Sequence, residues 1–93
     1  MMDERTISKY SFKDTGIVLT DESLIVRSNG SERRVPISKI NSFYVYPKRK
    51  LLGKMFLVFA NISDEEDFEV LSIDEKNSAV SLKNDLNRAL EDL

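Results

Sequence analysis

The spacing of apolar residues changes once along this chain, near Ile73, and that change limits the folds open to it. Before Ile73, apolar and polar residues alternate in short runs with a period of two, which is typical of half-buried β-strands. After Ile73 the period becomes that of an α-helix with one apolar face. The sequence therefore predicts a series of strands closed by a single helix.

Turn signals divide the first two-thirds of the chain. They are KDTG, TDES, SNGS and SDEED, at residues 13–16, 20–23, 28–31 and 63–67. Asn29-Gly30 is the strongest signal, because both residues tolerate the positive φ that a type I′ hairpin turn requires. Turns at these short intervals predict an antiparallel arrangement.

The runs between the turns are rich in β-branched and aromatic residues, so we expect seven strands. Their expected bounds are Arg5–Phe12, Gly16–Thr20, Leu24–Ser28, Glu32–Ile37, Ser42–Tyr46, Lys54–Ile62 and Phe68–Ser72. Alternation directs one set of side chains toward the core. That set is Tyr10, Phe12, Ile17, Leu19, Leu24, Val26, Val35, Ile37, Phe43, Val45, Phe68 and Val70. In the run MFLVF no polar residues alternate with the apolar ones, which predicts a strand covered on both faces.

The two prolines restrict the strands that contain them, because proline has no N–H to donate to a ladder. Pro36 is expected at a strand end or on an edge strand. Pro47 is expected to end the fifth strand at Tyr46 for the same reason.

The C-terminal segment predicts a helix at about residues 74–92. Asp74 is the expected N-cap, and Glu75 in the first turn complements the helix dipole. The apolar stripe is Ala79, Leu82, Leu86, Ala89, Leu90 and Leu93, with Val80 beside it. Because everything before the helix is strand, the stripe is expected to pack on the sheet. With 93 residues the chain fits one domain, residues 1–93, of a mainly β (α+β) class.

Composition argues against several function classes. The chain has no cysteine and no histidine, so the best nucleophile and the commonest general base are both missing. We therefore predict no catalytic residue and no cofactor, and we do not expect this protein to be an enzyme. The net charge of −2 gives no reason to expect nucleic-acid binding.

The N-terminal stretch MMDERTISKY is polar and acidic where a signal peptide would be basic and then apolar. The longest apolar run, MFLVFA, is far shorter than the roughly 20 residues that a membrane span needs. A soluble cytoplasmic protein is the expectation from these two features.

Two strings sharpen the expected fold. GIVLTDESLIV (residues 16–26) resembles the second and third strands of small bacterial pleckstrin-homology-like (PH-like) domains, and VPISKINSFYV (residues 35–45) is similar to their fourth-to-fifth strand crossing. With the helix, the resemblance covers nearly the whole chain. It implies a partly open antiparallel β-barrel of about seven strands, built from two nearly orthogonal sheets, with the C-terminal helix closing one end.

Two charged runs have simple structural interpretations. The run Asp64–Asp67 lacks the alternating oxygen ligands and the glycine of a calcium loop, so a solvated turn is favoured and no metal site is predicted. Arg33 and Arg34 are expected to be exposed on an edge strand, where charge discourages unwanted pairing.

The segment KRKLLGK is the one candidate binding element, and three interpretations stay open. Lys48, Arg49, Lys50 and Lys54 could attract an anionic membrane while Leu51 and Leu52 insert into it. The two leucines could instead form a protein contact. The third interpretation is a solvated loop with one leucine turned into the barrel mouth, and the sequence ranks it narrowly ahead of the protein contact.

The resulting expectation is a non-catalytic binding or assembly module in a bacterial-type cytoplasm. Its contact is a protein partner or a homo-oligomer, and the alternative is a peripheral membrane adaptor that binds anionic lipid through residues 48–54.

Overall fold

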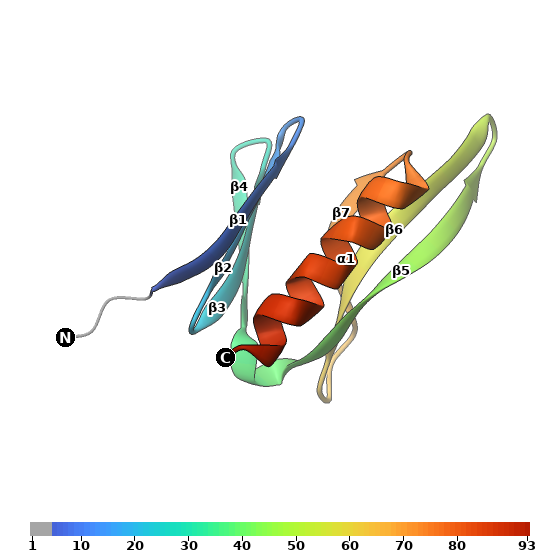
Figure 1. Cartoon of the computed structure of the whole chain (residues 1–93). Helices are drawn as coiled ribbons and strands as arrows, with labels where there is room; N and C mark the ends of the chain where they lie inside the picture. Colours follow the sequence, from blue (N-terminus) through green and yellow to red (C-terminus); the bar gives the residue numbers. More distant parts are fainter. Residues whose placement is uncertain (1–4) are drawn as a thin grey trace.

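The computed structural model describes residues 5–93 as seven strands, a short 3₁₀ helix and one α-helix (Figure 1). The elements are β1 Thr6–Phe12, β2 Thr15–Thr20, β3 Ser23–Ser28, β4 Ser31–Pro36, η1 Ile37–Lys39, β5 Ile40–Lys50, β6 Gly53–Ile62, β7 Phe68–Ile73 and α1 Lys76–Glu91. Residues 1–4, which belong to the polar stretch where we expect no signal peptide, lie outside this range. The predicted class, strands followed by one C-terminal helix, is confirmed.

Within residues 5–93 the strands form two separate antiparallel sheets and do not close into a barrel. One sheet has the order β1-β2-β3-β4 and the other the order β5-β6-β7. Every neighbour in a sheet is also a neighbour in sequence, as expected for strands joined by short turns.

Two hairpin turns of the first sheet depend on positive φ. Asn29 and Gly30 have φ of 49° and 78°, which confirms the predicted turn between β3 and β4. The KDTG turn is shorter than predicted. Phe12 pairs with Thr15, so only Lys13 and Asp14 form the loop, while Gly16 already belongs to β2.

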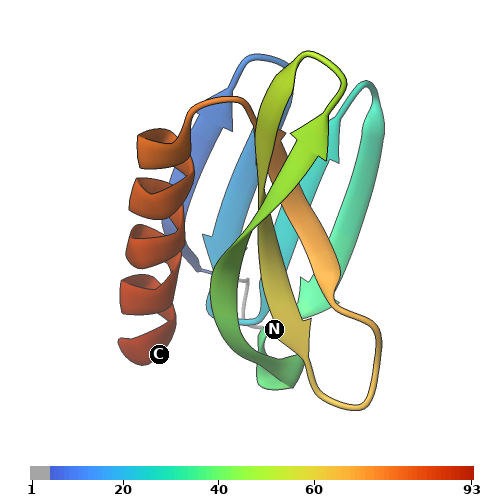
Figure 2. The same ribbon diagram turned by 90° about the vertical axis from the view of Figure 1, so that its right-hand side faces the viewer.

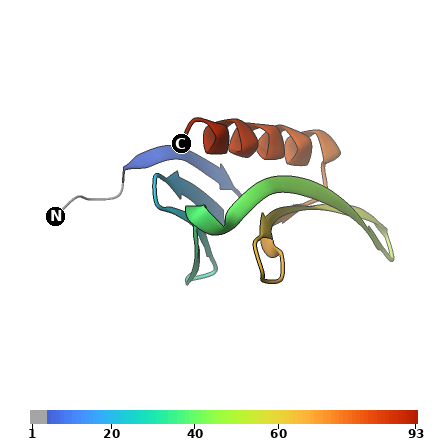
Figure 3. The same ribbon diagram turned by 90° about the horizontal axis from the view of Figure 1, so that it is seen from below.

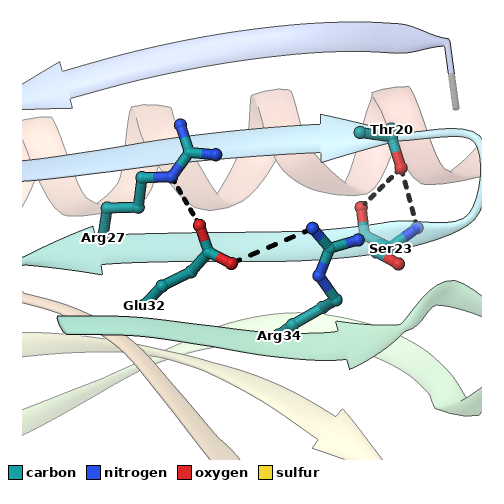
Figure 4. Close-up of polar contacts among 5 residues, drawn as sticks. All are labelled: Thr20, Ser23, Arg27, Glu32 and Arg34. Carbon is teal, nitrogen blue, oxygen red and sulfur yellow. Dashed lines mark hydrogen bonds and ion pairs between the residues drawn. The ribbon is translucent and has the colours of Figure 1, made fainter.

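The β2–β3 turn is held by the side chain of Thr20, which is 4% exposed. Its hydroxyl accepts the backbone N–H of Ser23 (2.8 Å) and donates to the carbonyl of Ser23 (3.2 Å) (Figure 4). The same hydroxyl accepts the backbone N–H of Glu22 (3.1 Å). One hydroxyl therefore satisfies three buried or partly buried polar groups of a tight turn.

The chain passes from the first sheet to the second at η1. We predicted that the fourth strand continues to Ile37, but β4 ends at Pro36 and Ile37 begins η1. Ser23 pairs with Pro36, and the N–H of Ile37 donates to the carbonyl of Glu22 (2.9 Å), which continues the ladder by one bond before the chain turns into η1. Pro36 is thus the last residue of an edge strand, as predicted.

The prediction that Pro47 ends the fifth strand is wrong, because β5 continues through it to Lys50. The N–H and C=O of Phe43 both point away from β6, since Asn87 of the helix bonds to both. Backbone groups repeat direction every second residue, so Pro47 also faces the open edge of the sheet. A missing N–H on that side removes no ladder bond.

Helix α1 begins two residues later than predicted. The N-cap is Glu75, not Asp74, and it makes no side-chain capping bond. The first helical bond runs from the N–H of Ala79 to the carbonyl of Glu75 (3.2 Å). Asp74 therefore lies before the helix, and Glu75 is outside the first turn.

The helix fills the gap between the edge strands β1 and β5. Its side chains Ser81 and Leu82 line a hollow together with Tyr10 and Phe12 of β1, and Asn87 bonds to β5. Figures 2 and 3 show α1 running along one side of the two sheets. On the opposite side the Arg33 guanidinium of β4 lies 4.8 Å from the ring centre of Phe68 of β7.

One cluster of buried side chains joins both sheets to the helix. Most residues predicted to face inward belong to it, and the helix contributes Ala79, Leu82, Leu86 and Ala89, all at most 8% exposed. Tyr10, Phe12, Ile37, Val45 and Phe68 are partly buried and pack against the cluster. Leu93, predicted on the stripe, is 46% exposed.

The strand predicted to be covered on both faces is β6. Val58 and Leu57 are neighbours in the chain and lie on opposite faces, yet they are 0% and 7% exposed. Val58 belongs to the core. Leu57 lies opposite Tyr46 in the ladder, on the outer face of the sheet.

Candidate binding site

The segment KRKLLGK forms the end of the long β5–β6 hairpin. The ladder continues to the pair Lys50–Gly53, so Leu51 and Leu52 form a two-residue turn. Gly53 has φ of 122°, a conformation that side chains disfavour, which gives the glycine a structural role. Figures 1 and 3 show this hairpin end projecting from the sheets. We call residues 48–54 the cationic tip.

Both leucines of the cationic tip point into solvent. Leu51 is 99% exposed and Leu52 is 95% exposed. The interpretation that one leucine turns into the barrel mouth is therefore wrong. The cause is that β5 runs past Pro47, which carries the turn away from the core.

The four cations lie on both faces of the hairpin around the leucines. Strand alternation places Lys48 and Lys50 on the outer face with Tyr46, and Arg49 on the opposite face. Arg49 lies directly opposite Lys54 in the ladder. Like charges in that position oppose strand pairing, so this arrangement does not serve stability.

Within residues 5–93 none of the ion pairs involves the four cations of the cationic tip, although Lys50 lines a hollow together with Asp14 and Asp74. The β3–β4 hairpin differs in this respect. There the Glu32 carboxylate lies 2.7 Å from Nε of Arg27 and 3.9 Å from a guanidinium nitrogen of Arg34 (Figure 4). The hydrogen bond from Arg27 lowers the pKa of Glu32 below its usual range.

Aromatic side chains line the outer face of the hairpin behind the tip. Tyr44 and Phe59 stack with ring centres 5.5 Å apart, and Tyr46 meets Phe59 edge-on at 6.4 Å. Tyr46 is 55% exposed. This cross-strand cluster stiffens the hairpin that carries the tip.

The acidic run that follows β6 is an exposed turn, as predicted. Asp64 has φ of 63°, and Glu65 pairs with Lys39 (3.3 Å). Asp67 accepts hydrogen bonds from the Tyr44 hydroxyl and from Nδ2 of Asn61 (3.0 Å). The Tyr44 hydrogen bond lowers the pKa of Asp67, and the same bond raises the pKa of Tyr44.

Residues 5–93 contain no group of three or more acidic, histidine or cysteine side chains placed to hold a metal ion. The same residues contain no helix long and apolar enough to cross a membrane. Arg33 and Arg34 are exposed on the edge strand β4, as predicted.

A second feature, which the sequence did not indicate, lies at the opposite end of the molecule. The β2–β3 turn, η1 and the end of α1 surround a depression of about 710 Å³. Ile37, Leu90 and Leu93 provide apolar lining. Asp21, Glu22 and Glu91 provide acidic lining. We call it the acid-rimmed pocket. Its residues come from three distant segments, so no local pattern could have revealed it.

Comparison with known proteins leaves these two features to be interpreted on their own geometry. No protein-family model matches the chain, and neither a curated protein nor a solved structure matches it.

Proposed function

We propose that this domain is a non-catalytic binding or assembly module whose contact element is the cationic tip. The observation that carries the proposal is the exposure of Leu51 and Leu52, at 99% and 95%, on a projecting two-residue turn. Burying one leucine side chain contributes about 1.5–3 kcal/mol, so the pair supplies the apolar centre of a contact. The cations around it select a surface with acidic groups.

A protein contact is the first choice because the tip is narrow and convex. Its apolar part consists of two side chains, which suit a pocket on a partner. Arg49 opposite Lys54 is unfavourable in the free domain, and an acidic partner relieves that repulsion. The same feature gives the contact a strong dependence on ionic strength.

An anionic membrane is the second candidate, and one observation favours it. The cations lie on both faces of the hairpin, so they can reach lipid headgroups on every side of the inserted leucines. Each contributes about 1 kcal/mol near an anionic surface. Cosedimentation with anionic vesicles at physiological salt tests this candidate. Firm binding that charge reversal at Lys48 and Arg49 abolishes would place the membrane first.

The fold is part of the proposal. We infer that the two sheets and the helix form the partly open barrel of a PH-like domain. The turn at η1 between the sheets, the helix between β1 and β5, and the two strings in residues 16–26 and 35–45 support this inference.

Site-specific photo-crosslinking in cells tests the tip as a contact element. A photoreactive amino acid replaces Leu51, and a matched protein carries it at Asn84, an exposed position of the helix. We expect adducts at position 51 that greatly exceed those at position 84. The adducts should be lost when Lys48 and Arg49 are both changed to glutamate, because the cations orient the contact.

The mass of each adduct distinguishes the partners. A second copy of the chain doubles the mass, another protein adds its own mass, and a lipid adds little. Equal and low labelling at positions 51 and 84 would contradict the proposal.

A further inference from the structure

Figure 1 shows the end of the β5–β6 hairpin at one end of the molecule and η1 with the end of α1 at the other. The residues that line the acid-rimmed pocket belong to the latter end. The tip ends the β5–β6 hairpin, while the pocket lies where β5 begins, beside η1 and the C-terminal end of α1. A single copy therefore cannot place its own tip in its own pocket.

The two features are complementary in shape and polarity. The tip is convex and ends in the exposed pair Leu51 and Leu52. The pocket is a shallow, open depression of about 710 Å³ with a mainly apolar lining. Leu93 in that lining is itself 46% exposed, so the pocket presents apolar surface to an incoming group.

Charge is complementary as well. Glu22 and Glu91 border the apolar lining, and within residues 5–93 neither takes part in an ion pair. Asp21 stands beside them, with its carboxylate accepting the backbone N–H of Arg5 (3.0 Å). The acidic turn Asp64–Asp67 lies at the same end of the molecule. If Leu51 and Leu52 of another copy contacted the apolar lining, the cations beside them would lie near these carboxylates.

We propose that copies of this chain associate head to tail, with the cationic tip of one copy seated in the acid-rimmed pocket of the next. This proposal rests on the tip being the contact element and names the partner as a second copy. Leu51 and Leu52 occupy the apolar lining, and the cations on either side of them pair with Glu22 and Glu91.

Such a contact joins two different surfaces, so it does not close on itself at a dimer. Each added copy leaves one tip and one pocket free, and growth continues as a chain or closes as a ring. The area of a hairpin tip is small compared with a standard interface, so a single contact is weak and reversible. Assembly should therefore depend steeply on protein concentration and on salt.

Two variants separate this geometry from other forms of association. The tip variant carries Leu51→Ser and Leu52→Ser and keeps its cations and its pocket. The pocket variant carries Glu22→Lys and Glu91→Lys and keeps its tip. All four positions are exposed, so both variants should fold as the parent does. Lys9→Glu with Asp85→Lys, at exposed positions away from both features, is the matched control.

Sedimentation velocity at low salt over a concentration series is the measurement. The parent and the control should form a growing series of species, and each variant alone should stay monomeric. An equimolar mixture of the two variants should form a 1:1 dimer and nothing larger, because only one intact tip–pocket contact can form. Leu51→Ser with Leu52→Ser in the pocket variant should weaken that dimer at least about tenfold.

Three results would overturn the proposal. They are a monomeric parent at all concentrations, a mixture that stays monomeric, or a symmetric dimer that the pocket variant still forms. The proposed function fails separately, through crosslinking at position 51 that does not exceed the control. Crosslinking to another protein or to lipid, with a monomeric parent, would reject the head-to-tail contact and keep the tip as the contact element.

Discussion

Asn87 of the helix pairs with the backbone of Phe43 as a neighbouring strand would. Its Oδ1 accepts the N–H of Phe43 at 2.7 Å, and its Nδ2 donates to the carbonyl of the same residue at 3.0 Å. These bonds fix the helix against the open edge of β5. They also cover one of the positions where β5 could pair with another chain, and Pro47 removes the N–H at another.

Asn87→Ala tests the value of this pairing. Both backbone groups of Phe43, which are partly buried, lose their partner, so the free energy of unfolding should fall by about 1–3 kcal/mol. Urea denaturation measures the change. Asn84→Ala, at an exposed position one turn earlier on the same helix, is the control and should change stability little. Equal urea midpoints for the two variants would show that water satisfies the backbone groups of Phe43 as well as Asn87 does, without loss of stability.

Leu86→Asp tests whether the helix is structural. Leu86 is 0% exposed, so a carboxylate there is buried without a partner and should destabilise the domain by more than about 3 kcal/mol. That is most of the stability of a domain this small. Thermal unfolding of this variant and of Asn84→Asp, its exposed counterpart, measures the difference. A melting temperature within a degree or two of the parent would show that the apolar stripe of the helix does not stabilise the domain.

The hydrogen bond between Tyr44 and Asp67 should appear in two titrations. The pKa of Asp67 is lowered, so its contribution to stability is present above the usual carboxyl range and is lost as pH falls through the folded-state pKa. The pKa of Tyr44 is raised, so its contribution is complete below the usual tyrosine pKa and is lost as pH rises through the folded-state value.

Asp67→Asn removes the anionic acceptor, and the pKa of Tyr44 should then fall toward its usual value. NMR titration of the Tyr44 ring in the parent and in Asp67→Asn measures this. An unchanged Tyr44 titration would contradict the hydrogen bond as the cause.

Pro47→Thr tests the edge position of the proline. Threonine restores an N–H that faces the open edge, so no ladder bond is gained, and the freer unfolded chain should lower stability by less than about 1 kcal/mol. The newly completed edge should raise aggregation, measured by light scattering during storage. A gain in stability above about 1 kcal/mol would mean that Pro47 interrupts the ladder after all.

Local pattern was enough to predict most of the elements. The change of period at Ile73 predicted the helix, and Asn29-Gly30 predicted a turn that has φ of 49° and 78°. Alternation correctly assigned Ile17, Leu19 and Val26 to the core. These features depend on neighbours in sequence, which is why the sequence alone revealed them.

What the sequence did not reveal depends on contacts between distant segments. Pro47 does not end β5 because that strand lies at a sheet edge, a fact of sheet order. Thr20 holds its turn through three hydrogen bonds that no composition rule specifies. The cationic tip was found from its residues, but the exposure of both leucines follows from the length of the hairpin.

The most direct test of the central claim is a concentration series of ¹H–¹⁵N NMR spectra of the parent chain at low salt, up to about 1 mM, where contacts this weak are populated. We predict that amide shifts move together in two groups at opposite ends of the molecule. One group is residues 48–54 of the tip and the other surrounds Glu22, Ile37 and Glu91. Added salt should reverse the shift changes of both groups, because it screens the attraction between the tip and the pocket. Tip amides that stay fixed across the series, or that move while the pocket amides do not, would contradict the head-to-tail account.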